Sequence, residues 1–154
     1  MPGKDSRDPY CNYTFRVSWD GRVVAGVTRV SAIKQIVEIV EYREAGDSGA
    51  TRKLPGRTKF DAITLERGFT RDSEFEAWAS QVTGAAGLQQ YRKDVRIEVL
   101  DSQGRVTVAF VFHRCWPSEY AAVTGLEAGE DCCLIQSLTL QTEGWERDTS
   151  IDPR

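Results

Sequence analysis

The side chains best suited to chemistry are the single histidine and the four cysteines of this 154-residue chain. His113 and Cys115 lie two residues apart, so on a strand both would project from one face and could interact. A pair of this kind can act as a nucleophile or contribute to a metal site. The chain has no CxxC pair, and the adjacent Cys132 and Cys133 would project to opposite faces of a strand. We therefore expect no metal site.

The remaining polar residues form no recognisable catalytic arrangement. No third group is placed in the sequence to orient His113, and the carboxylates are scattered rather than paired. In a reducing compartment the cysteines, Cys11 included, are most simply small buried apolar residues. We expect no catalytic residues, no cofactor and no enzymatic activity.

A glycine-rich segment at 45–56 is the second place where chemistry could occur. It contains Gly46, Gly49 and Gly56 among charged residues, as phosphate-binding loops do. It lacks the GxxxxGK[ST] spacing of those loops, and no helix is expected to follow it. The segment is therefore expected to join two strands rather than to bind a nucleotide.

The composition is that of an ordinary globular domain. Hydrophobic residues make up 40% of the chain and charged residues 28%, with 20 basic against 23 acidic side chains. The resulting net charge of -3 provides no general attraction to nucleic acid. No apolar run approaches the roughly 18 residues of a membrane span, and the N-terminus lacks the apolar core of a signal peptide. We expect a protein made in a cytoplasm, with no membrane anchor.

Two long strands joined by the glycine-rich segment form the most unusual element, a hairpin over about 32–68. The first strand is expected over 33–44 and the second over 57–67. At about 3.3 Å per residue the first would reach roughly 40 Å, whereas a compact chain of this length has a radius of gyration of about 15 Å. Such a hairpin would protrude, and its open edges would favour pairing with another chain.

The first hairpin strand is apolar on both faces, which leaves two interpretations open. A central strand of a sandwich is covered on both faces by its own domain. Alternatively, the second face meets a neighbouring subunit.

Alternation of apolar and polar residues predicts the other strands, and helical spacing predicts one helix at about 70–83. In the helix Phe75, Trp78, Ala79 and Val82 form one apolar stripe, Thr70 or Asp72 can cap the start and Gly84 the end. Trp116–Pro117 is expected to end a strand. The further strands are expected at 10–19, 22–30, 92–100, 106–112 and 132–142, with a loop at 118–131.

The fold class is therefore mainly β: an antiparallel β-barrel or sandwich of six to seven strands with one flanking α-helix and a long protruding β-hairpin. We expect a flexible arm at 1–9, a single domain at 10–146 and a loose polar tail from Gly144 onward, with 147–154 outside the domain. The core candidates are Phe15, Val17, Trp19, Phe75, Trp78, Ile97, Val99, Phe110, Phe112, Leu138 and Leu140.

The order of several segments resembles one protein family along almost the whole chain. The segments are DPYCNYTFRVSWDG, VAGVTRVSAI, RKLPGRTKFDAITLERG, VRIEVLDSQGRVTVAFVFHRCWPSEY and IQSLTLQTEGWER. Together they resemble the inner-tube, or tail-tube, proteins of contractile phage tails and of phage-tail-like contractile injection systems. Cys132–Cys133 is unusual for this family.

The resemblance implies a structural protein with a β-barrel and a side helix. Six subunits would form a ring, rings would stack into a hollow tube, and a contractile sheath would propel the tube through a target envelope with cargo inside. The implied partners are other copies of the chain, a sheath protein, baseplate or spike-hub proteins, a tube-terminating cap and protein cargo. The chain would be made in the bacterial cytoplasm and assembled into a particle that stays there or is released.

Three other functions remain open. One is the tail tube of a true contractile phage, which conducts DNA. Another is a secreted ring protein of a type VI secretion system, which has a related fold. The third is a monomeric β-barrel that binds a small ligand.

The resemblance also indicates which hairpin residues meet the channel and which meet the next ring. The phase of the first strand is ambiguous, because either alternating set could face the channel. The channel-lining candidates are Gln35, Glu41, Arg43, Ala62, Thr64 and Glu66. The inter-ring candidates are Asp47, Arg52, Lys53, Leu54, Pro55 and Gly56.

Overall fold

The structure is a computed structural model that describes residues 13–43, 45–46, 49, 51–83, 91–125, 128 and 134–151. These residues form ten strands and one helix, so the expected fold class is confirmed: mainly β, antiparallel, with one helix. The strands outnumber the expected six to seven, because two expected strands divide and one lies in the expected tail. The elements are β1 (Thr14–Trp19), β2 (Arg22–Val24), β3 (Val27–Val30), β4 (Gln35–Tyr42), β5 (Arg52–Phe60), β6 (Ile63–Gly68), α1 (Glu74–Thr83), β7 (Lys93–Leu100), β8 (Val106–Ala121), β9 (Ile135–Gln141) and β10 (Gly144–Arg147).

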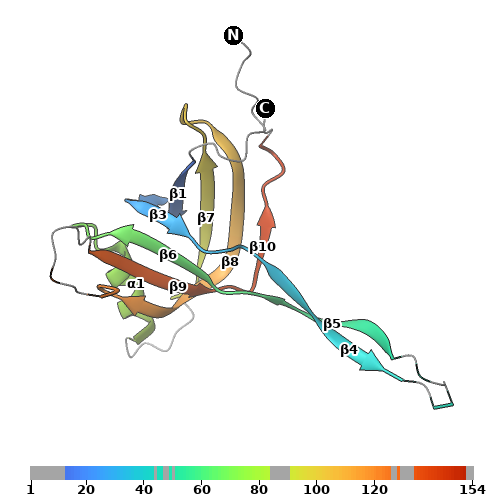
Figure 1. The fold of residues 1–154 in the computed structure, drawn as a ribbon. Coiled ribbons are helices and arrows are strands. Elements are labelled where there is room, and N and C mark those ends of the chain that lie inside the picture. The colour runs from blue at the N-terminus through green and yellow to red at the C-terminus, as the bar shows by residue number, and fades with distance from the viewer. Residues whose placement is uncertain are drawn as a thin grey trace, which may run out of the picture.

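Eight strands build the body of the molecule (Figure 1). They follow the order β2-β1-β7-β8-β9-β6-β3, and β10 pairs with β8. Near the two ends of this order β1 and β3 contact each other, so the sheet curls round a single core. The remaining two strands, β4 and β5, form a separate two-stranded sheet.

The core lies inside the curled sheet and under α1. Trp19 of β1 packs against both buried aromatic residues of the helix, with ring centroids 6.0 Å from Phe75 and 4.7 Å from Trp78. The helix therefore covers one side of the core. Of the core candidates, Val17, Trp19, Phe75, Trp78, Ile97, Phe112, Leu138 and Leu140 are buried, and Phe15, Val99 and Phe110 are partly buried.

Strand β8 corrects the expectation that Trp116–Pro117 ends a strand and that a loop begins at 118. The strand continues to Ala121, but it bends: Arg114 has a φ of 50°, and the register shifts between Pro117 and Glu119. Its first half pairs with β7 and β10, and its second half pairs with β9. Pro117 is tolerated because this second half has only β9 as a neighbour among the described residues.

Local geometry corrects the bounds of two other expected elements. The strand expected over 22–30 divides, because Gly26, at a φ of 79°, turns the chain between β2 and β3. The helix begins at Glu74 rather than 70, where the side chain of Asp72 accepts the N–H of Glu74 at 2.9 Å.

The expected loose tail is partly ordered. Residues 144–147 form β10, and the N–H of Asp148 donates to the carbonyl of Ala109 at 2.9 Å. The ring of Trp145 explains this order, because it packs beside the core. The expected arm at 1–9, Cys11, Gly84 and Cys132–Cys133 lie outside the described residues.

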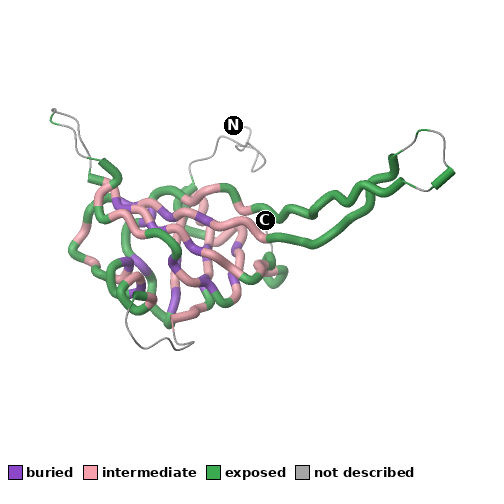
Figure 2. Tube along the Cα trace, turned by 90° about the horizontal axis from the view of Figure 1, so that it is seen from below, coloured by how far each residue is buried: buried purple, intermediate pink, exposed green. Residues whose placement is uncertain are grey.

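The hairpin protrudes from the body, as its length predicts (Figures 1 and 2). All eight residues of β4 are exposed. Its expected bounds were wrong in two places. The expected loop at 45–56 is shorter, because β5 already begins at Arg52, and the expected second strand at 57–67 is divided between β5 and β6.

Candidate assembly surface

The protruding hairpin is continuous with the β3–β6 pair of the body through an irregular joint. The N–H of Ser31 donates to the carbonyl of Thr64 at 2.9 Å, and the N–H of Asp61 donates to the carbonyl of Lys34 at 3.2 Å. The side chains of Lys34 and Asp61 also form an ion pair at 3.3 Å. The β3–β6 pair and the β4–β5 pair are thus parts of one long hairpin, and its hydrogen-bond ladder is interrupted where the chain leaves the body.

Aromatic packing holds the root of the hairpin against the body. The ring of Phe60, the last residue of β5, lies edge-on to Trp145 of β10 with centroids 6.1 Å apart. Trp145 in turn lies edge-on to Phe110 of β8 at 5.9 Å. This row of three rings sets the direction in which the hairpin leaves.

A bulge in β5 allows the two hairpin strands to approach closely. Val37 pairs with Thr58 and Ile39 with Pro55, so β5 contains one additional residue between these pairs. A Cβ atom on Gly56 would lie 2.9 Å from Cγ2 of Val40 and 3.2 Å from the carbonyl oxygen of Glu38. Glycine is therefore the residue that fits this position without a steric clash.

Both faces of the hairpin expose apolar side chains beside charged ones. Ile39 is 66% exposed on one face, and Leu54 is 49% exposed on the other. By the strand register, Gln35, Val37, Ile39, Glu41, Lys53 and Pro55 share the first face, and Ile36, Val40, Tyr42, Arg52 and Leu54 share the second. A two-stranded sheet with exposed apolar faces is marginal alone, and an apolar surface of this kind is typical of an interface.

The structure separates the channel-lining candidates into two groups. Gln35 and Glu41 lie on the first hairpin face, and Arg43 is exposed just beyond β4. Thr64 and Glu66 lie in β6, on the face of the body sheet turned away from the core, with Ala62 at the joint.

The two groups have different neighbours. Gln35 pairs with Phe60, whose ring turns toward Trp145 of the body. Thr64 bonds Thr139 of β9 through their hydroxyls at 3.1 Å, and Glu66 pairs with Arg29 of β3 at 3.7 Å. Their channel-lining role stays a prediction.

The inter-ring candidates lie mostly within a strand. Residues 52–56 were expected in a loop, but they belong to β5, where Arg52–Leu54 pair with Val40–Tyr42. Their side chains therefore alternate between the two hairpin faces instead of gathering at one tip. Asp47 lies outside the described residues.

His113 and Cys115, which could interact if they shared one strand face, lie in different surroundings. Cys115 belongs to the buried core, and burial raises the pKa of its thiol to about 12. His113 is exposed, with Nε2 3.2 Å from a carboxylate oxygen of Glu146. The two side chains diverge because the positive φ of Arg114 interrupts the strand alternation.

The described part of the chain also bears on two other functions, metal binding and membrane spanning. No group of three or more His, Cys, Asp or Glu side chains is placed to hold a metal ion there. Among the same residues, no helix has the length and apolarity needed to cross a membrane.

A buried guanidinium, which was not among the residues expected to matter, joins β6 to the start of the helix. Arg67 of β6 is 0% exposed; its Nε donates to Gln136 of β9 at 3.0 Å, and Nη2 to the carbonyl of Asp72 at 2.6 Å. Its guanidinium also lies 3.9 Å from the ring centroid of Phe75. Burial lowers the pKa of Arg67, against the opposing effect of Asp72. The alternation of Ile63 and Leu65 could have placed Arg67 on the inner face.

Asp72 is the carboxylate partner of this guanidinium. Burial alone would raise its pKa, but the N–H groups of Glu74 and Ala25 and the charge of Arg67 outweigh that effect and hold the pKa below its usual value. Its carboxylate thus connects the helix start, the β2–β3 turn and the guanidinium.

Comparisons with known proteins agree with this architecture. Residues 11–146 match the family described as T4-like virus tail tube protein gp19. A search of curated proteins gave no match.

Among solved structures, a chain of the PVC sheath–tube complex, an extracellular contractile injection system in its extended state, has a TM-score of 0.75 at 20% identity, covering 93% of this chain and 94% of that chain. A chain from the anti-feeding prophage baseplate, 6-fold symmetrised, has a TM-score of 0.73 at 18% identity, covering 96% and 95%. Hcp1 from Flavobacterium johnsoniae has a TM-score of 0.56 at 14% identity, covering 87% and 94%. At these identities the similarity shows a common fold.

Proposed function

Because this chain belongs to the T4-like virus tail tube protein gp19 family, we propose that it is the structural subunit of the inner tube of a contractile injection system. Six copies close into a ring, and the rings stack into a hollow tube that a contracting sheath propels through a target envelope. The domain expected over 10–146 is the assembling unit. Its role is structural, and it carries no catalytic activity.

The observation that carries this proposal is the exposed hairpin. Both of its faces expose apolar side chains, and its two outer edges pair with no other strand among the described residues. Such edges pair readily with another chain, and closure of a ring removes them. A monomeric ligand-binding barrel gives no reason for a long, exposed, apolar hairpin.

The injection system is favoured over the alternatives by degree of structural similarity. Chains from contractile injection systems have TM-scores of 0.72 to 0.75, whereas Hcp and type six secretion system chains have 0.51 to 0.57. The tail tube of a contractile phage is the second candidate, because the matching family is described by a T4-like virus tail tube.

The similar structures also support particular partners and a location. They include chains from a sheath–tube complex, a baseplate and a tube-terminating cap. We therefore propose a sheath protein, baseplate or spike-hub proteins and a cap as partners, with protein cargo in the lumen. The subunit is made in the bacterial cytoplasm and assembled there into a phage-tail-like particle.

The proposal is tested by light scattering and negative-stain microscopy of the purified chain. Six copies of the 17.3 kDa chain give a ring of about 104 kDa, and stacked rings are expected as concentration rises. A strict monomer at high concentration would contradict the proposal. Capsid and terminase genes beside this gene would point to a phage, and free rings in culture medium without sheath or baseplate genes would point to type VI secretion.

A further inference from the structure

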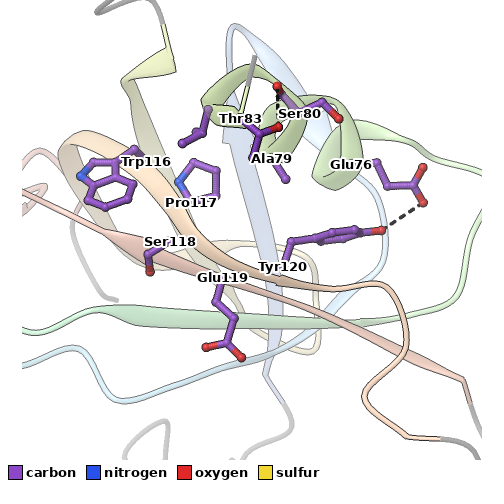
Figure 3. A pocket seen from close by; sticks show the side chains of 10 residues that line it. Glu76, Ala79, Ser80, Thr83, Trp116, Pro117, Ser118, Glu119 and Tyr120 are labelled. Carbon is purple, nitrogen blue, oxygen red and sulfur yellow. Dashed lines mark hydrogen bonds between the residues drawn. The ribbon is translucent and has the colours of Figure 1, made fainter. Parts of the chain in front are cut away.

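A cleft of about 440 Å³ lies between α1 and the second half of β8 (Figure 3). The helix contributes one wall, and the strand contributes the other. Its lining residues are Glu76, Ala79, Ser80, Val82, Thr83, Trp116, Pro117, Ser118, Glu119 and Tyr120. Ala79 and Val82, two residues of the apolar stripe of α1, thus face this cleft instead of the core.

The cleft lies along the second half of β8, where the strand is irregular. Residues 116–120 are consecutive and all line it, and the register shift between Pro117 and Glu119 interrupts the alternation of their side chains. Only β9 pairs with this half of β8 among the described residues, so its other edge offers backbone donors and acceptors. A strand edge beside a helix is a typical receptor for an added extended segment.

The side chains of the cleft define the chemistry of that segment. Glu76 and Glu119 are acidic, none of the lining residues is basic, and Ala79, Val82 and Trp116 are apolar. Glu76 accepts a hydrogen bond from the hydroxyl of Tyr120 at 3.0 Å, and Glu119 is exposed. The cleft therefore suits an extended segment that is both basic and apolar.

We propose that β5 of a second copy of this chain occupies the cleft. Strand β5 carries Arg52, Lys53, Arg57 and Lys59 with no acidic residue, and it exposes Leu54. Its outer edge pairs with no strand in the described part of the chain, since only β4 lies beside it. The two unpaired edges thus complement each other in charge and in hydrogen-bonding groups.

The shape of the subunit supports this pairing. The hairpin leaves the body on the side away from α1 (Figure 1), and it extends far beyond the body (Figure 2). In a ring of identical subunits, one side of each copy meets a different side of the next. The inference rests on the proposed ring. It names the surface that receives the hairpin, and it replaces the expected inter-ring contact of residues 52–56 with a contact within the ring.

The lengths also agree. Residues 116–121 of β8 span about 20 Å at the rise of a strand. The basic part of β5, residues 52–57, has the same number of residues.

Photo-crosslinking of the assembled full-length chain tests the location. A benzophenone amino acid in place of Ser80, an exposed residue of the cleft wall, is expected to crosslink to residues 52–60 of a second copy, as mapped by mass spectrometry. The matched control replaces Ala77, which is exposed on the same helix outside the cleft, and is expected to give no such crosslink. Rings in which Ser80 crosslinks elsewhere or nowhere would overturn this inference and leave the proposed function intact. A wild-type chain that forms no rings would overturn both.

Charge reversal gives a second, independent readout. Glu119→Lys is expected to lower the assembled fraction about tenfold at fixed concentration, because it places like charges against each other. Adding Lys53→Glu and Arg57→Glu is expected to restore assembly. Glu146→Lys, on an exposed carboxylate of β10, is the control and should assemble normally. Unchanged assembly of Glu119→Lys, or no recovery in the combined variant, would overturn the proposed pairing.

Discussion

Gly56→Ala is expected to weaken assembly without weakening the body. The added Cβ would lie 2.9 Å from Cγ2 of Val40 and 3.2 Å from the carbonyl oxygen of Glu38. Overpacking of this kind costs about 1–3 kcal/mol, and the exposed hairpin can relax toward the lower value. All of this cost falls on β4 and β5, so the thermal midpoint of the body should stay within about 1 °C of wild type.

The effect on assembly follows from the number of hairpins in a ring. Each subunit contributes one hairpin to the proposed ring. A free hairpin can relax away from the clash, whereas a hairpin held between subunits cannot, so a cost of about 1 kcal/mol opposes the addition of each subunit. That cost corresponds to about a fivefold rise in the concentration at which half of the chains are assembled.

Sedimentation velocity over a concentration series measures this midpoint. The matched control is Gly125→Ala, since a Cβ there meets nothing within 4 Å. Assembly of Gly56→Ala at the same concentration as the control, or a lower thermal midpoint of the body, would contradict this prediction.

Three further predictions concern the body. Arg67→Met leaves the acceptors of Gln136 and Asp72 without their donor. The substitution should lower the free energy of unfolding by about 3 kcal/mol and the thermal midpoint by roughly 6–12 °C. A shift under about 2 °C would contradict the role given to the guanidinium. The pKa of Asp72 is held below its usual 3.8 in the folded chain, so its stabilising contribution is present above that pH and is lost as pH falls below it. Asp72→Asn should therefore flatten the decline of the thermal midpoint in acid, and an unchanged slope would count against this assignment. Cys115 is buried, and its thiol has a pKa of about 12. Mass spectrometry should therefore find no alkylation of Cys115 at pH 8 until denaturant is added. Rapid labelling of the native chain would contradict its burial.

Strands with a strict alternation were predictable, because one face of each is buried. Val17 and Trp19 of β1, and Leu138 and Leu140 of β9, are buried as this pattern requires. The same rule would have placed Arg67 inside, but a charge on an inner face is acceptable only with partners that come from distant segments.

Other features depend on contacts between distant segments and were not predictable. The positive φ of Arg114 bends β8 so that Pro117 can lie in an edge strand. Trp145 orders β10 because it packs between Phe60 and Phe110. The bulge at Gly56 likewise depends on the register between β4 and β5.

The protrusion of the hairpin was predictable from its length alone, whereas the assignment of residues to its two faces was not. Its phase depends on the pairing of Gln35 with Phe60, which no local pattern reveals. The cleft beside α1 was missed for a related reason. Ala79 and Val82 continue the apolar stripe of the helix, and only the bend of β8 leaves them lining a cleft.

The central claim, that the hairpin converts a single subunit into a ring and a tube, is tested most directly by shortening it. In the variant, residues 46–54 are replaced by a tight turn, and negative-stain images of this variant and of the wild type are compared at equal concentration. We expect rings and stacked tubes for the wild type, and a folded monomer with an unchanged thermal midpoint for the variant. Rings and tubes that form normally without the hairpin tip would contradict it.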